Sequence, residues 1–167
     1  TAVGKDAGLS LTTATYTTLI GAFAGDAITT GTFNTAVGGA SLTANTTGAN
    51  NTAVGTSALA SNSTASNNTA LGFEALATNS TGHTNVAVGA LALDANTTGN
   101  YNIALGVNAL TANTTAADNI AIGTSALGAN TTGTNNVAVG QNALDAVTTS
   151  NNNIAIGLDT LSGAAGN

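Results

Sequence analysis

The sequence predicts an all-β fold, a parallel β-roll or narrow β-solenoid of about ten coils. Glycine recurs at every seventeenth position along the chain, and the residues before each of these glycines alternate as in a short strand. The ten glycines are Gly4, Gly21, Gly38, Gly55, Gly72, Gly89, Gly106, Gly123, Gly140 and Gly157. A fixed period kept over the whole length indicates one short unit stacked many times. We therefore assign residues 1–167 to a single repeat domain.

Each repeat has a strand pattern just before its glycine, as in Asn102–Gly106. The residue preceding the glycine is Val, Ile or Leu in all ten repeats, and the one before that is Ala in nine, with Leu19 as the exception. β-Branched residues that alternate with a small residue are typical of a strand. We expect the glycine to end the strand, where φ is positive or a Cβ would clash.

A leucine column and a turn follow each glycine. Leucine stands four residues after most of the glycines, and Gly8 and Gly25 replace it in the first two repeats. Stretches such as Asn96–Gly99 come next, and Asn and Gly favour turns. Each coil is thus predicted to hold two short strands and two turns. Helical repeats are disfavoured, since they need about 33 residues or more and since Gly, Thr and Asn suit helix interiors poorly.

We expect the Val/Ile/Leu column to fill the coil interior and the alanine column to form an exposed strip. Alanine is an unusual residue for a solvated strand, so the strip is predicted to be an interface. It comprises Ala36, Ala53, Ala70, Ala87, Ala104, Ala121, Ala138 and Ala155. One coil buries too little apolar surface to offset the entropy of ordering a whole repeat. The chain is therefore expected to associate with itself, most simply as a parallel homotrimer.

An asparagine stands four residues before the glycine in eight repeats, and we expect these side chains to form a ladder between coils. The residues are Asn34, Asn51, Asn68, Asn85, Asn102, Asn119, Asn136 and Asn153.

Composition excludes several classes of partner. Charged residues make up 5% of the chain, the net charge is −6, and Lys5 is its only basic residue. Without a basic patch we expect no nucleic-acid partner, and the short apolar runs predict no membrane insertion. Cysteine is absent, so no disulfide or thiolate site is expected. The chain starts at Thr1 rather than Met, so we expect a segment of a longer protein.

The unit Asn-Thr-Ala-Val-Gly-x-x-Ala-Leu-x-x-Asn-Thr-Thr-Gly, nearly intact at Asn34–Gly48 and Asn51–Ala65, resembles repeats of phage tail-fibre-like and bacterial surface proteins. It is also similar to the head repeats of trimeric autotransporter adhesins, through Asn119–Gly123 and Asn153–Gly157. The resemblance implies a left-handed, trimeric β-roll with an attachment or spacer role. Those heads have a shorter period, and no neck, stalk or anchor is recognisable in this chain.

No catalytic, cofactor-binding or metal-binding residues are predicted, so we expect no cofactor and no enzyme. His83 is the only histidine and falls in a variable turn. Asp94 and Asp145 recur at one repeat position but three coils apart, about 14 Å, which is too far for paired acid/base chemistry.

Three binding alternatives remain open. Columns of adjacent threonines, such as Thr97 and Thr98, suggest an ice-binding face. Asn-x-Ser/Thr sites suggest glycosylation at Asn45, Asn62, Asn79, Asn96, Asn113 and Asn130. Three aromatic residues, Tyr16, Phe33 and Tyr101, share one repeat position and suggest a patch that contacts sugars, with turn packing as the competing interpretation.

The predicted function is a segment of an extracellular fibre, in a phage tail fibre on the virion or in a bacterial surface appendage. It would act as a rigid spacer with attachment to a host or surface. The alternative is an extracellular filament subunit that stacks end to end, and a minor one is a glycan-binding or ice-binding module with a cell-surface glycan as partner.

Overall fold

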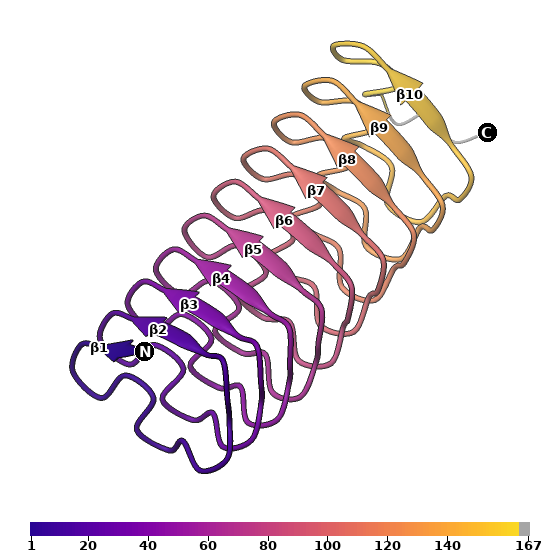
Figure 1. Ribbon diagram of the computed structural model, residues 1–167. Helices are drawn as coiled ribbons and strands as arrows, with labels where there is room; N and C mark the ends of the chain where they lie inside the picture. Colours follow the sequence, from indigo (N-terminus) through magenta and orange to yellow (C-terminus); the bar gives the residue numbers. More distant parts are fainter. Residues whose placement is uncertain (164–167) are drawn as a thin grey trace.

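A β-solenoid is seen in the computed structural model, which describes residues 1–163; residues 164–167 of the predicted domain lie outside this description. Ten short parallel strands form one sheet in the order of the sequence, one strand per coil. Figure 1 shows the strands side by side along a rod, with β1 and β10 at opposite ends. Nine intervals of ~4.8 Å give the sheet a length of about 43 Å. The predicted fold class is confirmed.

The strands recur with the predicted period and pair without a register shift. They are β1 (Ala2–Val3), β2 (Thr18–Ile20), β3 (Thr35–Val37), β4 (Thr52–Val54), β5 (Thr69–Leu71), β6 (Val86–Val88), β7 (Ile103–Leu105), β8 (Ile120–Ile122), β9 (Val137–Val139) and β10 (Ile154–Ile156). Ala104 of β7 pairs with Ala121 of β8, for example, and the other strands repeat this register. Identical positions therefore stack in columns along the whole rod.

The second strand predicted for each coil is absent from residues 1–163, and a series of turns takes its place. The leucine column is the reason, since Leu42 and Leu110 each have φ of 53°, in the left-handed region. An extended strand cannot continue through that conformation. The turns opposite the strands still form hydrogen bonds from coil to coil, since the backbone N–H of Leu110 donates to the carbonyl of Ala126 at 3.0 Å.

The interior of a regular coil is narrow and holds one leucine, two small residues and two asparagines. Ala104, Ala109 and Leu110, all from one coil, are each fully buried. The first and third residues of the strand, Ile103 and Leu105, point outward and are half-buried. A single leucine fills the space opposite the strand, so only alanine fits at the strand's centre.

The predicted orientation of the strands is therefore wrong. The alanines expected to form an exposed interface strip face the interior, and the Val/Ile/Leu column expected to fill the core faces outward. The buried alanines are Ala36, Ala53, Ala70, Ala87, Ala104, Ala121, Ala138 and Ala155, none more than 3% exposed. Their small size reflects the narrow coil rather than a contact with another chain.

The first two coils replace the interior leucine and compensate for it nearby. Gly8 and Gly25 occupy its position with φ of 63° and 54°, so the left-handed backbone is kept. A Cβ at either glycine would lie 2.8 Å from a methyl group of Leu19, the one strand residue that replaces the central alanine. Ile28 fills the rest of the space and is fully buried. The irregular coils thus conserve core volume.

The glycine that sets the period is required both by its conformation and by its neighbour. Gly89 has φ of +131°, and a Cβ there would lie 2.6 Å from the backbone of Gly106 in the next coil. Both parts of the prediction for these glycines are confirmed.

Candidate functional surfaces

The predicted asparagine ladder is present, and it joins side chains to the backbone of the next coil. At each of the seven steps from Asn34 to Asn153, the Oδ1 atom accepts the backbone N–H of the equivalent asparagine one repeat on, at 2.9–3.1 Å. The amide nitrogen of Asn102 also donates to the carbonyl of Ala116 at 2.8 Å. The column therefore clamps each coil to its neighbour.

A second ladder runs through the asparagines considered as glycosylation sites. At each of its five steps the Nδ2 donates to the Oδ1 of the preceding coil, at 2.9–3.3 Å. Apolar Ile28 and Val147 occupy the same position in the coils before and after the ladder. Sequence reasoning missed this ladder because the residues resemble ordinary turn formers.

Burial argues against the glycosylation sites in the folded chain. Asn45, Asn62, Asn79, Asn96, Asn113 and Asn130 are all fully buried. Their Nδ2 atoms, where a sugar would be attached, also donate to the carbonyl three residues on, as Asn96 does to Gly99 at 3.1 Å. A sugar at these positions would have to displace the ladder and open the coil.

In most of the threonine pairs, the first residue bonds to the next coil and the second faces solvent. The first hydroxyl of the pairs that begin at Thr46, Thr97, Thr114 and Thr131 donates to the next coil, as Thr97 Oγ1 does to the carbonyl of Thr114 at 3.0 Å. The second threonine, such as Thr98, is exposed. The exposed column offers one line of hydroxyl groups rather than the flat array on which the ice-binding alternative rests.

The first and third residues of the strands together form the outer sheet face. From β6 to β10 every one of them is Val, Ile or Leu: Val86, Val88, Ile103, Leu105, Ile120, Ile122, Val137, Val139, Ile154 and Ile156. From β2 to β5 the first residue is threonine in each strand. Within residues 1–163, no charged residue occurs in any of the ten strands. An uncharged sheet face lined by aliphatic side chains is typical of an interface.

The residue just before each asparagine of the first ladder, together with Tyr16 at the equivalent position before Thr17, forms an exposed ridge column along one edge of the coils. It comprises Tyr16, Phe33, Asn50, Asn67, Thr84, Tyr101, Asp118, Asn135 and Asn152, all exposed and all with φ between 57° and 63°. The backbone N–H of Tyr101 donates to the carbonyl of His83 in the preceding coil at 3.3 Å. His83 itself lies beside this ridge and packs edge-on against the Tyr101 ring.

Two aspartates are used to bind neighbouring coils. Asp26 accepts the hydroxyl of Thr43, and Asp94 accepts that of Thr111, both at 2.6 Å. Sequence reasoning missed these bonds, although in both cases a threonine follows the aspartate exactly one repeat later. Among residues 1–163, no group of three His, Cys, Asp or Glu side chains could hold a metal ion. In the same range, no helix is long and apolar enough to cross a membrane.

Together these features define a β-solenoid rod with an amide-lined interior, an apolar outer sheet face and a polar and aromatic ridge. No known family, curated protein or solved structure matches the chain. The resemblance to tail-fibre and autotransporter repeats therefore stays a prediction from the repeat motif.

Proposed function

We propose that the chain is a rigid spacer segment of an extracellular fibre, in a phage tail fibre or a bacterial surface appendage, that carries an attachment function. The supporting observation is its uninterrupted stack of near-identical coils. From Asn45 to Asn130, each coil is joined to the next by two buried asparagine ladders and by a continuous ladder of backbone hydrogen bonds. Coils joined in this way resist bending, as a spacer must. The resemblance of the repeat motif to fibre proteins supports the extracellular location.

The proposed fibre consists of several copies of the chain, most simply a parallel trimer, packed through the outer sheet face. This replaces the alanine strip as the contact. The face carries no charge, so two copies of net charge −6 meet there without direct repulsion. A second copy also has the same coil spacing, so its side chains match this face along the whole rod.

The size of the face bounds the strength of this association. Three residues at ~3.3 Å make each strand about 10 Å wide, so a face about 43 Å long offers roughly 430 Å² per copy. Two such faces lie near the lower limit for specific interfaces, about 1,000 Å² in total. We therefore expect the mass of the particle to depend on protein concentration for this stretch of chain.

Sedimentation equilibrium over a range of concentrations tests the proposal. The monomer mass is 15.8 kDa, and the proposal predicts a shift toward three times that value as concentration rises. Replacement of Ile103, Ile120 and Val137 by threonine copies the residue found at this position in β2 to β5 and should weaken association without changing the fold. Replacement of Val107 and Leu158, which are exposed outside the strands, by threonine is the matched control.

A monomer at every concentration that stays soluble would refute the assembly. Equal association by the sheet variant and the control would refute the assigned face. Electron microscopy of the same samples separates the two structural functions, since rods of one fixed length support the spacer and open filaments of variable length support the alternative of end-to-end stacking.

A further inference from the structure

The aromatic residues of the ridge column stand at an exposed position that the backbone disfavours for them. Tyr16, Phe33 and Tyr101 are 79%, 56% and 54% exposed, so more than half of each side chain faces solvent. Turn packing, the competing interpretation of their alignment, accounts for part of each ring, since Tyr16 stacks on Phe33 and His83 packs against Tyr101, but more than half of each side chain stays exposed. At Phe33 and Tyr101 the position is nevertheless fixed, because the backbone bonds to the preceding coil, as Phe33 N–H does to the carbonyl of Thr15 at 3.1 Å.

The local backbone works against aromatic residues at this position. Tyr16 and Phe33 have φ of 57° and Tyr101 has φ of 58°. Residues other than Gly, Asn and Asp are disfavoured in this left-handed region. Five of the six remaining residues of the ridge column are Asn or Asp, as this rule predicts. Residues that break a local rule and keep most of their surface exposed are expected at functional sites.

The exposed rings are arranged at two stations along the ridge. Tyr16 and Phe33 stack in parallel, with an angle of 3° between the ring planes and 5.0 Å between the centroids. Tyr101 lies four coils beyond Phe33, about 19 Å along the axis, and the His83 ring packs edge-on against it at 5.1 Å. The intervening ridge residues, Asn50, Asn67 and Thr84, supply amide and hydroxyl groups between the two stations.

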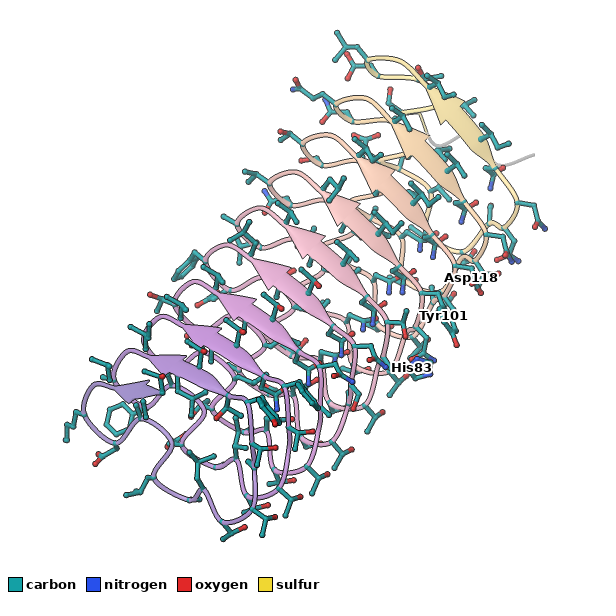
Figure 2. All side chains as sticks on the ribbon, in the orientation of Figure 1. His83, Tyr101 and Asp118 are labelled. Carbon is teal, nitrogen blue, oxygen red and sulfur yellow. The ribbon has the colours of Figure 1, made fainter. Side chains whose placement is uncertain are left out.

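Polar groups surround the second station as well. Figure 2 shows His83, Tyr101 and Asp118 along the same edge of the rod, each from a successive coil. His83 Nδ1 lies 3.2 Å from Thr84 Oγ1, so the ring is held between the Thr84 hydroxyl and Tyr101. Its backbone N–H donates to Asn100 Oδ1 at 2.7 Å. The station thus combines an aromatic ring with carboxylate, imidazole and hydroxyl groups on a fixed backbone.

We propose that the ridge column binds a linear, neutral polysaccharide that lies along the rod axis. Aromatic rings stack on the apolar faces of sugar rings, and amide, hydroxyl and carboxylate groups bind sugar hydroxyls, which is the mixture of groups found here. An acidic polymer is disfavoured, because the chain carries a net charge of −6 with Lys5 as its one Lys or Arg residue. This inference deepens the attachment part of the proposed function and rests on it for the extracellular setting.

Affinity electrophoresis in native gels tests the proposal. The gels contain one soluble polymer each: hydroxyethyl cellulose, glucomannan, arabinoxylan or dextran as neutral probes, and alginate as the acidic one. Wild-type protein should be retarded by at least one neutral polymer and not by alginate. A variant in which Tyr16, Phe33 and Tyr101 are all replaced by asparagine should bind at least about tenfold more weakly, the usual effect of removing aromatic anchors.

Asparagine is chosen because the same position holds it in Asn50, Asn67, Asn135 and Asn152, so the variant should fold at least as well as the wild type. Phe73→Thr is the matched control, since Phe73 is 52% exposed but lies outside the ridge column, and threonine holds its position at Thr56 and Thr124. The control should keep full retardation.

The proposal is overturned if no neutral polymer retards the wild type, if the asparagine variant and the wild type are retarded equally, or if alginate retards the wild type as strongly as the neutral polymers do. Sedimentation of the same variants keeps this outcome separate from the proposed assembly. A chain that binds polymer but stays monomeric would refute the trimeric fibre and leave the ridge site intact. A chain that associates but is not retarded by any neutral polymer would refute only the ridge site.

Discussion

The second asparagine ladder makes a sharp prediction about Asn96→Val. Asn96 is fully buried, and its Nδ2 donates to Asn79 Oδ1 at 2.9 Å while its own Oδ1 accepts from Asn113 Nδ2 at 2.9 Å. Valine is a fair replacement in shape, because Val147 occupies the same position in a coil beyond the ladder. The substitution therefore removes the hydrogen bonds with little change in volume.

The magnitude follows from the groups left without partners. Asn79 Oδ1 loses the one donor that it has among residues 1–163, and one amide hydrogen of Asn113 loses its acceptor. Each buried orphan costs about 1–3 kcal/mol. The carbonyl of Gly99 keeps a donor from Asn85 at 2.8 Å and adds little to the cost. With two orphans, Asn96→Val should lower the free energy of unfolding by about 2 to about 6 kcal/mol.

Urea denaturation followed by circular dichroism measures this loss, with Asn45→Val as the comparison. Asn45 begins the ladder, and its Oδ1 accepts from Asn62 Nδ2, so its replacement orphans one amide hydrogen, while the carbonyl of Gly48 keeps a donor from Asn34 at 2.8 Å. Asn45→Val should therefore cost roughly half as much as Asn96→Val. Replacing all six asparagines of the ladder by valine removes both partners of every ladder bond, leaves the backbone N–H of Gly133 without its acceptor, and should recover much of the loss. A neutral Asn96→Val, or a sixfold variant far less stable than the single one, would refute this reasoning.

Three further predictions concern the backbone and the core, and the same denaturation experiment checks each. Gly89→Ala should cost more than about 4 kcal/mol, because its Cβ would meet the backbone of the next coil at 2.6 Å, whereas Gly39→Ala, with no atom within 4 Å, should stay within about 0.5 kcal/mol. Leu110→Ala opens the fully buried core and should cost about 3–5 kcal/mol. Gly25→Leu should cost about 1–3 kcal/mol, and adding Leu19→Ala with Ile28→Val should restore most of it, since both side chains lie within 2.8 Å of a Cβ at Gly25. The triple variant copies Ala138, Leu144 and Val147 of a later coil, and losses that simply add would argue against compensation at that site.

The architecture could be predicted because the 17-residue spacing of the glycines does not depend on which way the side chains point. Glycine at every seventeenth residue indicates stacked coils whichever way the strands face. The positive φ of Gly89 and the bonding along the column that begins at Asn34 also follow from the stacking of equivalent positions. These features needed only the spacing and the chemistry of glycine and asparagine.

The orientation of the strands could not be predicted, because alternation alone does not say which face is inside. Large apolar residues such as Ile103 and Leu105 would bury more surface than alanine, but the width of the coil decides the outcome. Leu110 from the opposite wall fills the interior and leaves room only for Ala104. The left-handed backbone of the leucine column, which sets that wall, has no signal in the leucines themselves.

Part of the missing information is in the irregular repeats. Leu19 departs from the alanine column in the same region where Gly8 and Gly25 depart from the leucine column. A paired exchange of large and small residues indicates that the two columns share one interior. The surfaces were harder to assess, since the exposure of Tyr101 and the burial of Asn96 depend on which way each turn folds.

The orientation of the strands is the central claim, because both the core and the proposed surfaces depend on it, and thiol labelling of single cysteine variants tests it most directly. The chain has no native cysteine, so Ala104→Cys, Ile103→Cys and Leu105→Cys each introduce one thiol. Labelling is measured at a concentration where sedimentation shows a monomer. The structure predicts that the thiol at position 104 is protected until the chain unfolds, while those at 103 and 105 react readily. Rapid labelling at 104 with protection at both neighbours would contradict it.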